Sequence, residues 1–189
     1  MVIDKSCVSN IIPGVSGEQE ARRALENCAT IEKKSIVREE GSINSMPLIT
    51  YQWRLSPRQR GQINVVSGTV NSLALELTRG TALGEFMNEL GTPDSLSATY
   101  HVYEQCTTSI TLDYPNKGIS LGIDRVFDCA TREGFLLEPE TNVTAYYRYK
   151  PDTLDNVLKT VIFMRENAVA GNKAHRQVWN GYGEIQINP

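Results

Sequence analysis

The chain has 189 residues with 40% apolar content, which is enough for one domain with a substantial hydrophobic core. Its 19 basic and 22 acidic residues give a formal net charge of −3 and are spread along the chain, without the basic stripe that neutralises phosphates. Nucleic acid is therefore not an expected partner, and no apolar run approaches the roughly 18 residues of a transmembrane segment.

The N-terminal segment predicts a helix over residues 17–28. A turn at Pro13-Gly14 precedes Ser16 and Gln19, whose spacing matches a capping box. After Gln19, alanine, leucine and cysteine residues recur at helical spacing. We therefore expect a short helix with Ser16 as its N-cap.

Three strands are expected after this helix. Their apolar residues alternate with polar or small ones, which is the period-two pattern of half-buried strands. The predicted strands lie around residues 49–54, 63–65 and 73–77. Ser67-Gly68 predicts a tight hairpin turn between the last two of them.

A similar order of elements follows in the middle of the chain. Thr81 is a predicted N-cap, an apolar stripe follows it, and Gly91 is expected to end the helix. Predicted strands then lie around residues 96–102, 110–114 and 119–123, with a hairpin turn at 115–118. We interpret the two segments as a degenerate duplication, although an order of helix and meander also recurs by chance.

The sequence therefore predicts an α+β fold with two tandem helix-plus-antiparallel-sheet units and a C-terminal strand–helix–strand extension. The first unit covers residues 1–78, the second covers 79–130, and the extension covers 131–189 and packs on the same domain. The expected core contains the apolar members of the strands and helix stripes, namely Leu25, Trp53, Phe86, Leu90, Tyr100, Ile110, Leu112 and Leu121.

No residue pattern indicates catalysis, a metal site or a cofactor. His101 and His175 lie on the polar side of a predicted strand and in a charged loop, away from any nucleophile motif. The acidic residues Asp113, Asp124 and Asp128 lack calcium-loop spacing and are interpreted as part of a solvated face.

The glycines at 181 and 183 precede no helix, so we interpret this Gly-x-Gly as a turn rather than a phosphate site. Arg54, Arg58 and Arg60 flank a predicted turn. Such a group either binds an anionic partner or keeps a hairpin soluble, and the second interpretation is the more common one.

The four cysteines, Cys7, Cys28, Cys106 and Cys129, form no Cys-x-x-Cys pair, and no histidine lies at ligand spacing from them. Zinc is therefore not expected. An even count at well-separated positions is compatible with two disulfides in an oxidising compartment or with four buried thiols in the cytosol.

Several short motifs lie along nearly the whole chain. They are Cys7 before Ile12-Pro13-Gly14-Val15-Ser16, Gly68, the run 80–93 ending in Leu-Gly-Thr-Pro, Cys106 before Tyr114-Pro115-Asn116-Lys117-Gly118-Ile119, Cys129, and Trp179-Asn180-Gly181-Tyr182-Gly183. Together these motifs resemble a family of uncharacterised, exported or lipid-anchored proteins of Chloroflexi-type bacteria. The helix before Leu-Gly-x-Pro is also similar to repeats of SmpA/OmlA-type lipoproteins and β-lactamase-inhibitor-like domains, which place helices against an antiparallel sheet and bind other proteins.

The resemblance bears on the cysteine pairing. Family members often carry a second cysteine four residues after the first, where this chain has Ile11, so Cys28 becomes the candidate partner of Cys7. With Cys106–Cys129, each predicted disulfide then brackets one unit. Closing a loop of about 20 residues contributes roughly 3 kcal/mol in the chain-entropy model.

The leading functional hypothesis is a non-enzymatic extracytoplasmic binding or structural module, such as a subunit of an envelope or surface assembly, with a protein partner. The alternatives are a proteinaceous inhibitor of an extracellular enzyme and a hydrolase with an unrecognised site. Export or a lipid anchor would depend on an N-terminal segment removed before Met1, and a cytoplasmic location is the alternative.

The predicted partner-binding surface is the polar face of the second unit's sheet. Its residues occupy the opposite strand phase from the core set, and tyrosine and arginine are residue types that anchor interfaces. The alternative is a merely solvated face, because threonine and tyrosine are good strand formers. The predicted surface comprises Thr99, His101, Tyr103, Ser109, Thr111 and Asp113, with Tyr146 and Arg148 adjoining.

Overall fold

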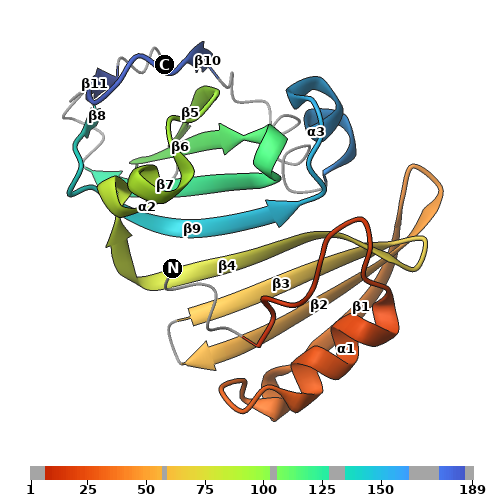
Figure 1. The fold of residues 1–189 in the computed structure, drawn as a ribbon. Helices are drawn as coiled ribbons and strands as arrows, with labels where there is room; N and C mark the ends of the chain where they lie inside the picture. Colours follow the sequence, from red (N-terminus) through yellow and green to blue (C-terminus); the bar gives the residue numbers. More distant parts are fainter. Residues whose placement is uncertain (1–6, 57–58, 103–105, 128–134, 162–174, 186–189) are drawn as a thin grey trace.

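The computed structural model describes residues 7–56, 59–102, 106–127, 135–161 and 175–185 (Figure 1). Its main feature is one nine-stranded sheet with the strand order β1-β2-β3-β4-β9-β7-β6-β5-β10, and a two-stranded sheet pairs β11 with β8. Every described strand pair is antiparallel.

The strands differ widely in length, from three residues to fourteen. They are β1 (Val37–Ile43), β2 (Met46–Ser56), β3 (Gln59–Val66), β4 (Thr69–Ala82), β5 (Ser95–Val102), β6 (Cys106–Tyr114), β7 (Ile119–Phe127), β8 (Phe135–Leu137), β9 (Asn142–Tyr149), β10 (His175–Val178) and β11 (Gly183–Ile185). The described helices are α1 (Glu18–Asn27), α2 (Leu83–Leu90) and α3 (Leu154–Thr160), with short 3-10 turns η2 (Lys33–Ser35) and η3 (Pro115–Lys117).

The α+β class is confirmed, but the division into tandem helix-plus-sheet units is not supported. β4 pairs with β9, and β9 pairs with β7, so strand pairing joins residues of all three expected parts in one sheet. Figure 1 shows β4 and β9 in the middle of the sheet, between β1–β3 and β5–β7. Residues 142–149, expected in an extension, are thus a central strand.

Most predicted turns and helices are present, with different caps. Gly68 and Gly118 have positive φ at the two expected hairpin turns, and Gly91 has φ +76° at the end of α2. The predicted capping box is wrong, because Gly17 is the N-cap of α1 and the Ser16 hydroxyl accepts a hydrogen bond from the amide of Ile12 instead. Thr81 belongs to β4 rather than capping α2.

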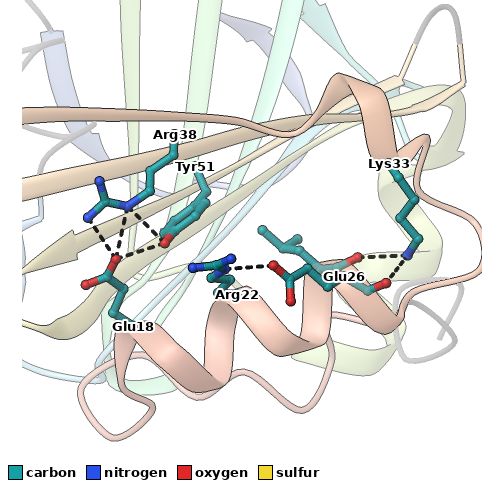
Figure 2. A network of polar contacts seen from close by, with 7 residues as sticks. Glu18, Arg22, Glu26, Lys33, Arg38 and Tyr51 are labelled. Carbon is teal, nitrogen blue, oxygen red and sulfur yellow. Dashed lines mark hydrogen bonds and ion pairs between the residues drawn. The ribbon is translucent and has the colours of Figure 1, made fainter.

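Helix α1 is fastened to the sheet at its N-terminal end by a polar network (Figure 2). The Glu18 carboxylate accepts hydrogen bonds from the Tyr51 hydroxyl at 2.8 Å and from the guanidinium of Arg38 at 3.1 and 3.2 Å. Arg38 and Tyr51 lie opposite each other on β1 and β2, so one carboxylate joins the helix to both strands.

The other end of α1 is closed by a cation and a disulfide. The Lys33 ammonium donates hydrogen bonds to the carbonyls of Leu25, Glu26 and Cys28, which satisfies carbonyl groups that a helix end leaves unpaired. Figure 2 shows Lys33 reaching back to Glu26 at this end of the helix. The predicted Cys7–Cys28 disulfide is present, and it ties the N-terminal segment to the residue that follows the helix.

The structure describes one of the two cysteines of the second predicted disulfide. Cys106 is fully buried in β6 and is disulfide-bonded. Cys129 lies outside the described residues, so the pairing Cys106–Cys129 stays a prediction.

The sheet has one face covered by α1 and α2 and another face that is mostly polar. The predicted core residues that the structure describes are all buried on the covered face, namely Leu25, Trp53, Phe86, Leu90, Ile110, Leu112 and Leu121. The side chain of Tyr100 lies outside the described residues. Helix α3 packs on the opposite face, where Val157 and Val161 form a small cluster with Tyr149.

The ring of Phe86 provides a test of this packing. Phe86 is 2% exposed, and its ring stacks on Tyr146 of β9 with 6.3 Å between the ring centroids. Phe86→Ala should lower the free energy of unfolding by about 3–5 kcal/mol, because truncation leaves a cavity between helix and sheet. Urea denaturation measures this change, and the exposed Glu89→Ala on the same helix is the control, with an expected change within about 0.5 kcal/mol. Equal effects of the two variants would contradict the packing.

Candidate functional site

An open groove of about 490 Å³ lies on the sheet face opposite α1 and α2. This volume falls in the usual range of ligand sites. It is formed by β1, β2, β3, β4 and β9 together with Ser35 of η2. The lining residues are Ser35, Val37, Gln52, Trp53, Arg54, Arg60, Gly61, Gln62, Asn64, Ala74, Leu75, Glu76, Ala145 and Tyr147.

Strand register explains which of these residues meet. Residues that pair across antiparallel strands point to the same face, and alternate residues along a strand share a face. One row across β2, β3, β4 and β9 is therefore Gln52, Gln62, Ala74 and Tyr147. The small side chain of Ala74 in the third position leaves space between the amides and the tyrosine.

The next row of the groove carries charge. Arg54 of β2 lies directly opposite Arg60 of β3, and Glu76 occupies the same face of β4. No ion pair joins either arginine to Glu76 or to any other acid in the part of the chain that the structure describes. Two like charges directly opposite each other on a sheet are destabilising, so this row contributes positive charge to the groove at a cost in stability.

A third row closes one end of the groove with satisfied polar groups. The Oδ1 atom of Asn64 accepts hydrogen bonds from Thr50 at 3.1 Å and from Gln62 at 3.0 Å, while its Nδ2 donates to Ser72 at 3.1 Å. Asn64 is 3% exposed. This buried network fixes the Gln62 side chain in place, whereas the Gln52 side chain makes no hydrogen bond within the described residues.

Tyr147 forms the β9 wall of the groove. Its ring lies against Gly122 of β7, where an added Cβ would be 3.2 Å from the ring. Burial, together with the nearby carboxylates of Asp124 and Glu76, raises the pKa of the Tyr147 hydroxyl to about 12. The hydroxyl therefore stays protonated at neutral pH.

Trp53 lies beneath the groove and is 1% exposed. Its ring covers Gly61, the residue that pairs with it on β3, so closely that a Cβ there would be 2.2 Å from the indole Cζ2. The indole Nε1 is buried without a hydrogen-bond acceptor in the described structure. Packing, rather than hydrogen bonding, therefore sets the position of this ring.

The predicted partner-binding residues do not form one exposed surface. Thr99 and Asp113 do lie on the polar face, but they are buried, at 8% and 0% exposure. Tyr146 was expected beside them and instead points to the core face, where it is 3% exposed and contacts Phe86. The expectation of exposure is wrong for all three residues. For Thr99 and Asp113 it treated strand phase as equivalent to solvent contact, and for Tyr146 it assigned the side chain to the wrong face of β9.

The other described members of the predicted surface lie on different faces of the sheet. Ser109 and Thr111 are half-buried on the polar face, and Ser109 donates a hydrogen bond of 2.6 Å to Asp124. Arg148 is half-buried on the core face, where its guanidinium donates to the carbonyl of Ser9 at 3.0 Å. The side chain of His101 and all of Tyr103 lie outside the described residues.

Asp113 instead organises a buried polar cluster. Its carboxylate accepts hydrogen bonds from Ser120 at 2.8 Å and Ser95 at 3.2 Å, and it forms an ion pair with Arg176 of β10 at 3.3 Å. The Tyr149 hydroxyl lies 3.0 Å from the Ser120 hydroxyl. Burial raises the Asp113 pKa, against the opposing effects of Ser120, Arg176 and Ser95. The cluster fastens β10 to the sheet, beyond its pairing with β5.

The aromatic segment Trp179–Gly183 forms a loop between β10 and β11. Trp179 and Tyr182 contact edge to face with centroids 5.8 Å apart, beside a cavity of about 140 Å³. Within the described residues, no group of three or more histidine, cysteine or acidic side chains is placed to hold a metal ion. None of the described helices is long and apolar enough to cross a membrane.

The groove and its framework thus define a protein built on an antiparallel sheet with a polar groove on one face. No protein-family model matches the chain, and the searches of curated proteins and of solved structures also gave no match. The resemblance to exported or lipid-anchored proteins therefore stays a prediction, and the functional argument depends on the groove itself.

Arg54 and Arg60 were singled out at the sequence level as a group that either binds an anionic partner or keeps a hairpin soluble, but the groove as a whole was not predicted. Gln62, Glu76 and Tyr147 carry no motif. Their association depends on the register between β3 and β4 and on the pairing of β4 with β9, which joins residues about 70 positions apart. Strand alternation gives the face of each residue but not its neighbour.

The contact between Gly61 and Trp53 predicts a strong effect of a single methyl group. Gly61→Ala should lower the free energy of unfolding by roughly 1–3 kcal/mol, because the buried indole has no space to move. Gly41→Ala in β1 is the matched control, since nothing lies within 4 Å of its added Cβ, and its stability should equal or exceed wild type. Both are measured by chemical denaturation. A Trp53→Phe change that costs as much in the Gly61→Ala background as in wild type would contradict the clash.

The raised pKa of Asp113 predicts a pH dependence of stability. A carboxyl group whose pKa is higher in the folded protein binds protons more strongly there, so its contribution to stability is largest at low pH and falls as pH rises above about 4. The difference in unfolding free energy between wild type and Asp113→Asn should therefore decrease between pH 4 and pH 7. Asp155→Asn, at an exposed site on α3, should show no such trend. A difference that increases with pH would mean that Arg176 dominates over burial.

Proposed function

We propose that the protein is a non-enzymatic extracytoplasmic binding module that holds a segment of a protein partner in the groove formed by β1–β4 and β9. The observation that carries this proposal is the exposed row of Arg54 and Arg60 beside the amide of Gln52, which none of the described residues hydrogen-bonds. Repulsion between the two arginines lowers the stability of the free protein, and the Gln52 amide has a donor and an acceptor that no described residue engages. A bound partner would relieve the repulsion and form hydrogen bonds with the amide.

The composition of the groove supports binding rather than catalysis. Its described lining contains neither histidine nor cysteine and has one carboxylate, that of Glu76. Glycoside hydrolysis ordinarily requires two carboxylates, and nucleophilic catalysis requires a nucleophile beside a base. Arginine, glutamine and tyrosine side chains are donors and acceptors suited to recognition.

An extracytoplasmic setting is supported by the disulfide between Cys7 and Cys28. Disulfides of this structural kind persist in oxidising compartments and are rare in the cytosol of mesophiles. Here the bond joins the N-terminal segment to the residue that follows α1. We propose on this basis that the protein acts in the cell envelope or on the cell surface, within a larger assembly.

Site-specific photo-crosslinking in the source organism tests the groove directly. Benzoylphenylalanine replaces Gln62 inside the groove, or Glu20 on the exposed side of α1 as the matched control. We expect a defined protein adduct from the Gln62 position and none from the Glu20 position, measured by immunoblot and mass spectrometry. Absence of an adduct at Gln62, or the same adducts at both positions, would contradict the proposed function.

A further inference from the structure

The side chains that line the groove indicate the chemistry of the molecule that would bind there. Resting on the proposed function, we propose that Arg54 and Arg60 bind the carboxylate side chains of an acidic polypeptide segment. Both guanidinium groups line the groove, and they lie directly opposite each other on adjacent strands. Paired guanidinium groups suit carboxylates, because each presents a planar set of donors for charge-assisted hydrogen bonds.

The first argument is that the two arginines have no internal counterion. Arg22, Arg38 and Arg176 each pair with an acidic side chain, whereas the described residues supply no such partner for Arg54 or Arg60. One unpaired surface arginine is ordinary. Two of them in direct cross-strand opposition repel each other, and an external anion would remove this repulsion.

The second argument concerns the amides that flank the charges. Gln52 and Gln62 form the neighbouring cross-strand pair, so an acidic side chain at the arginines places its own backbone near these amides. The Gln52 amide makes no hydrogen bond within the described residues and offers both a donor and an acceptor. A peptide bond also has one donor and one acceptor, so its N–H and C=O groups can both form hydrogen bonds with such an amide.

The third argument narrows the class of anion. Glu76 lies on the same face of β4 and also lines the groove, so an occupant with uniformly dense negative charge would be repelled there. A segment with individual carboxylates separated by peptide groups avoids this repulsion. The groove therefore favours an acidic peptide over a polyphosphate or a phosphorylated segment.

Fluorescence anisotropy with labelled peptides tests the assignment on the full chain. The probes are a peptide with four consecutive glutamates, the same peptide with four glutamines, and one with two phosphoserines in place of two glutamates. We expect binding of the glutamate peptide, at least about tenfold weaker binding of the glutamine peptide, and no gain from phosphoserine. Tighter binding of the phosphoserine peptide, or equal binding of the glutamine peptide, would overturn the carboxylate assignment.

Matched variants separate the groove from general electrostatics. The double variant Arg54→Gln/Arg60→Gln should weaken binding of the glutamate peptide by at least about tenfold, because hydrogen bonds to charged groups are lost. Arg23→Gln/Lys34→Gln removes the same charge from two exposed positions elsewhere and should leave affinity within about twofold. Equal losses in the two double variants would show non-specific attraction and overturn the proposal.

Stability and crosslinking complete the test. Removing one member of the like-charge pair should leave the melting temperature of Arg54→Gln equal to or above that of wild type, so weaker binding does not reflect unfolding. If no acidic peptide binds but benzoylphenylalanine at position 62 still captures a partner, the carboxylate assignment fails while the proposed function stands. If position 62 captures nothing, both fail.

Discussion

The pairing of β4 with β9 is the constraint on which the rest of this structure depends. It joins the meander β1–β4 to the meander β5–β7, since β9 also pairs with β7. Backbone groups in the middle of a sheet need partners on both sides, and β9 supplies them for both meanders. The groove spans this junction, because Tyr147 and Ala145 of β9 form the wall that faces the side chains of β3 and β4.

The two faces of the sheet differ in the side chains that they carry and in how much of each face is covered. The face under α1 and α2 buries large apolar side chains, and its polar contacts are at the periphery, where Glu18, Arg38 and Tyr51 hold the helix. The opposite face is covered at one end by α3, next to the buried carboxylate cluster of Asp113. It stays open over β2, β3 and β4. Polarity of a strand face therefore does not imply exposure along its whole length.

The charged side chains at the two ends of the polar face differ in whether other side chains compensate their charge. Asp113 is desolvated, and two hydroxyl groups and Arg176 compensate it, so this charge serves to hold β10 on the sheet. Arg54 and Arg60 remain in contact with solvent, opposite each other, and form no ion pair with an acid among the described residues. The first arrangement is satisfied by residues of the chain itself, whereas the second is the one that we propose a bound partner completes.

The sequence by itself determined the local elements and the face to which most side chains point. Helical spacing located α1 and α2, and period-two alternation placed Trp53, Ile110 and Leu121 in the core, because amphipathic periodicity is encoded within a few residues. Edge strand β1 was not recognised, since its side chains are largely exposed on both faces and leave no alternation. The Cys7–Cys28 disulfide was predicted from spacing and resemblance together.

Tertiary structure alone decided which strands are neighbours and what covers each face. The pairing of β4 with β9 is non-local, and nothing in either strand specifies its partner. The surroundings of the buried Asp113 depend on strands distant in sequence, such as edge strand β10, whose Arg176 forms an ion pair with the Asp113 carboxylate. The groove is likewise a product of register, because Arg54, Arg60 and Tyr147 meet only when three strand pairings are combined. The alternation of side chains can be read from the sequence of one strand, whereas a site is formed by residues of several strands that only the fold brings together.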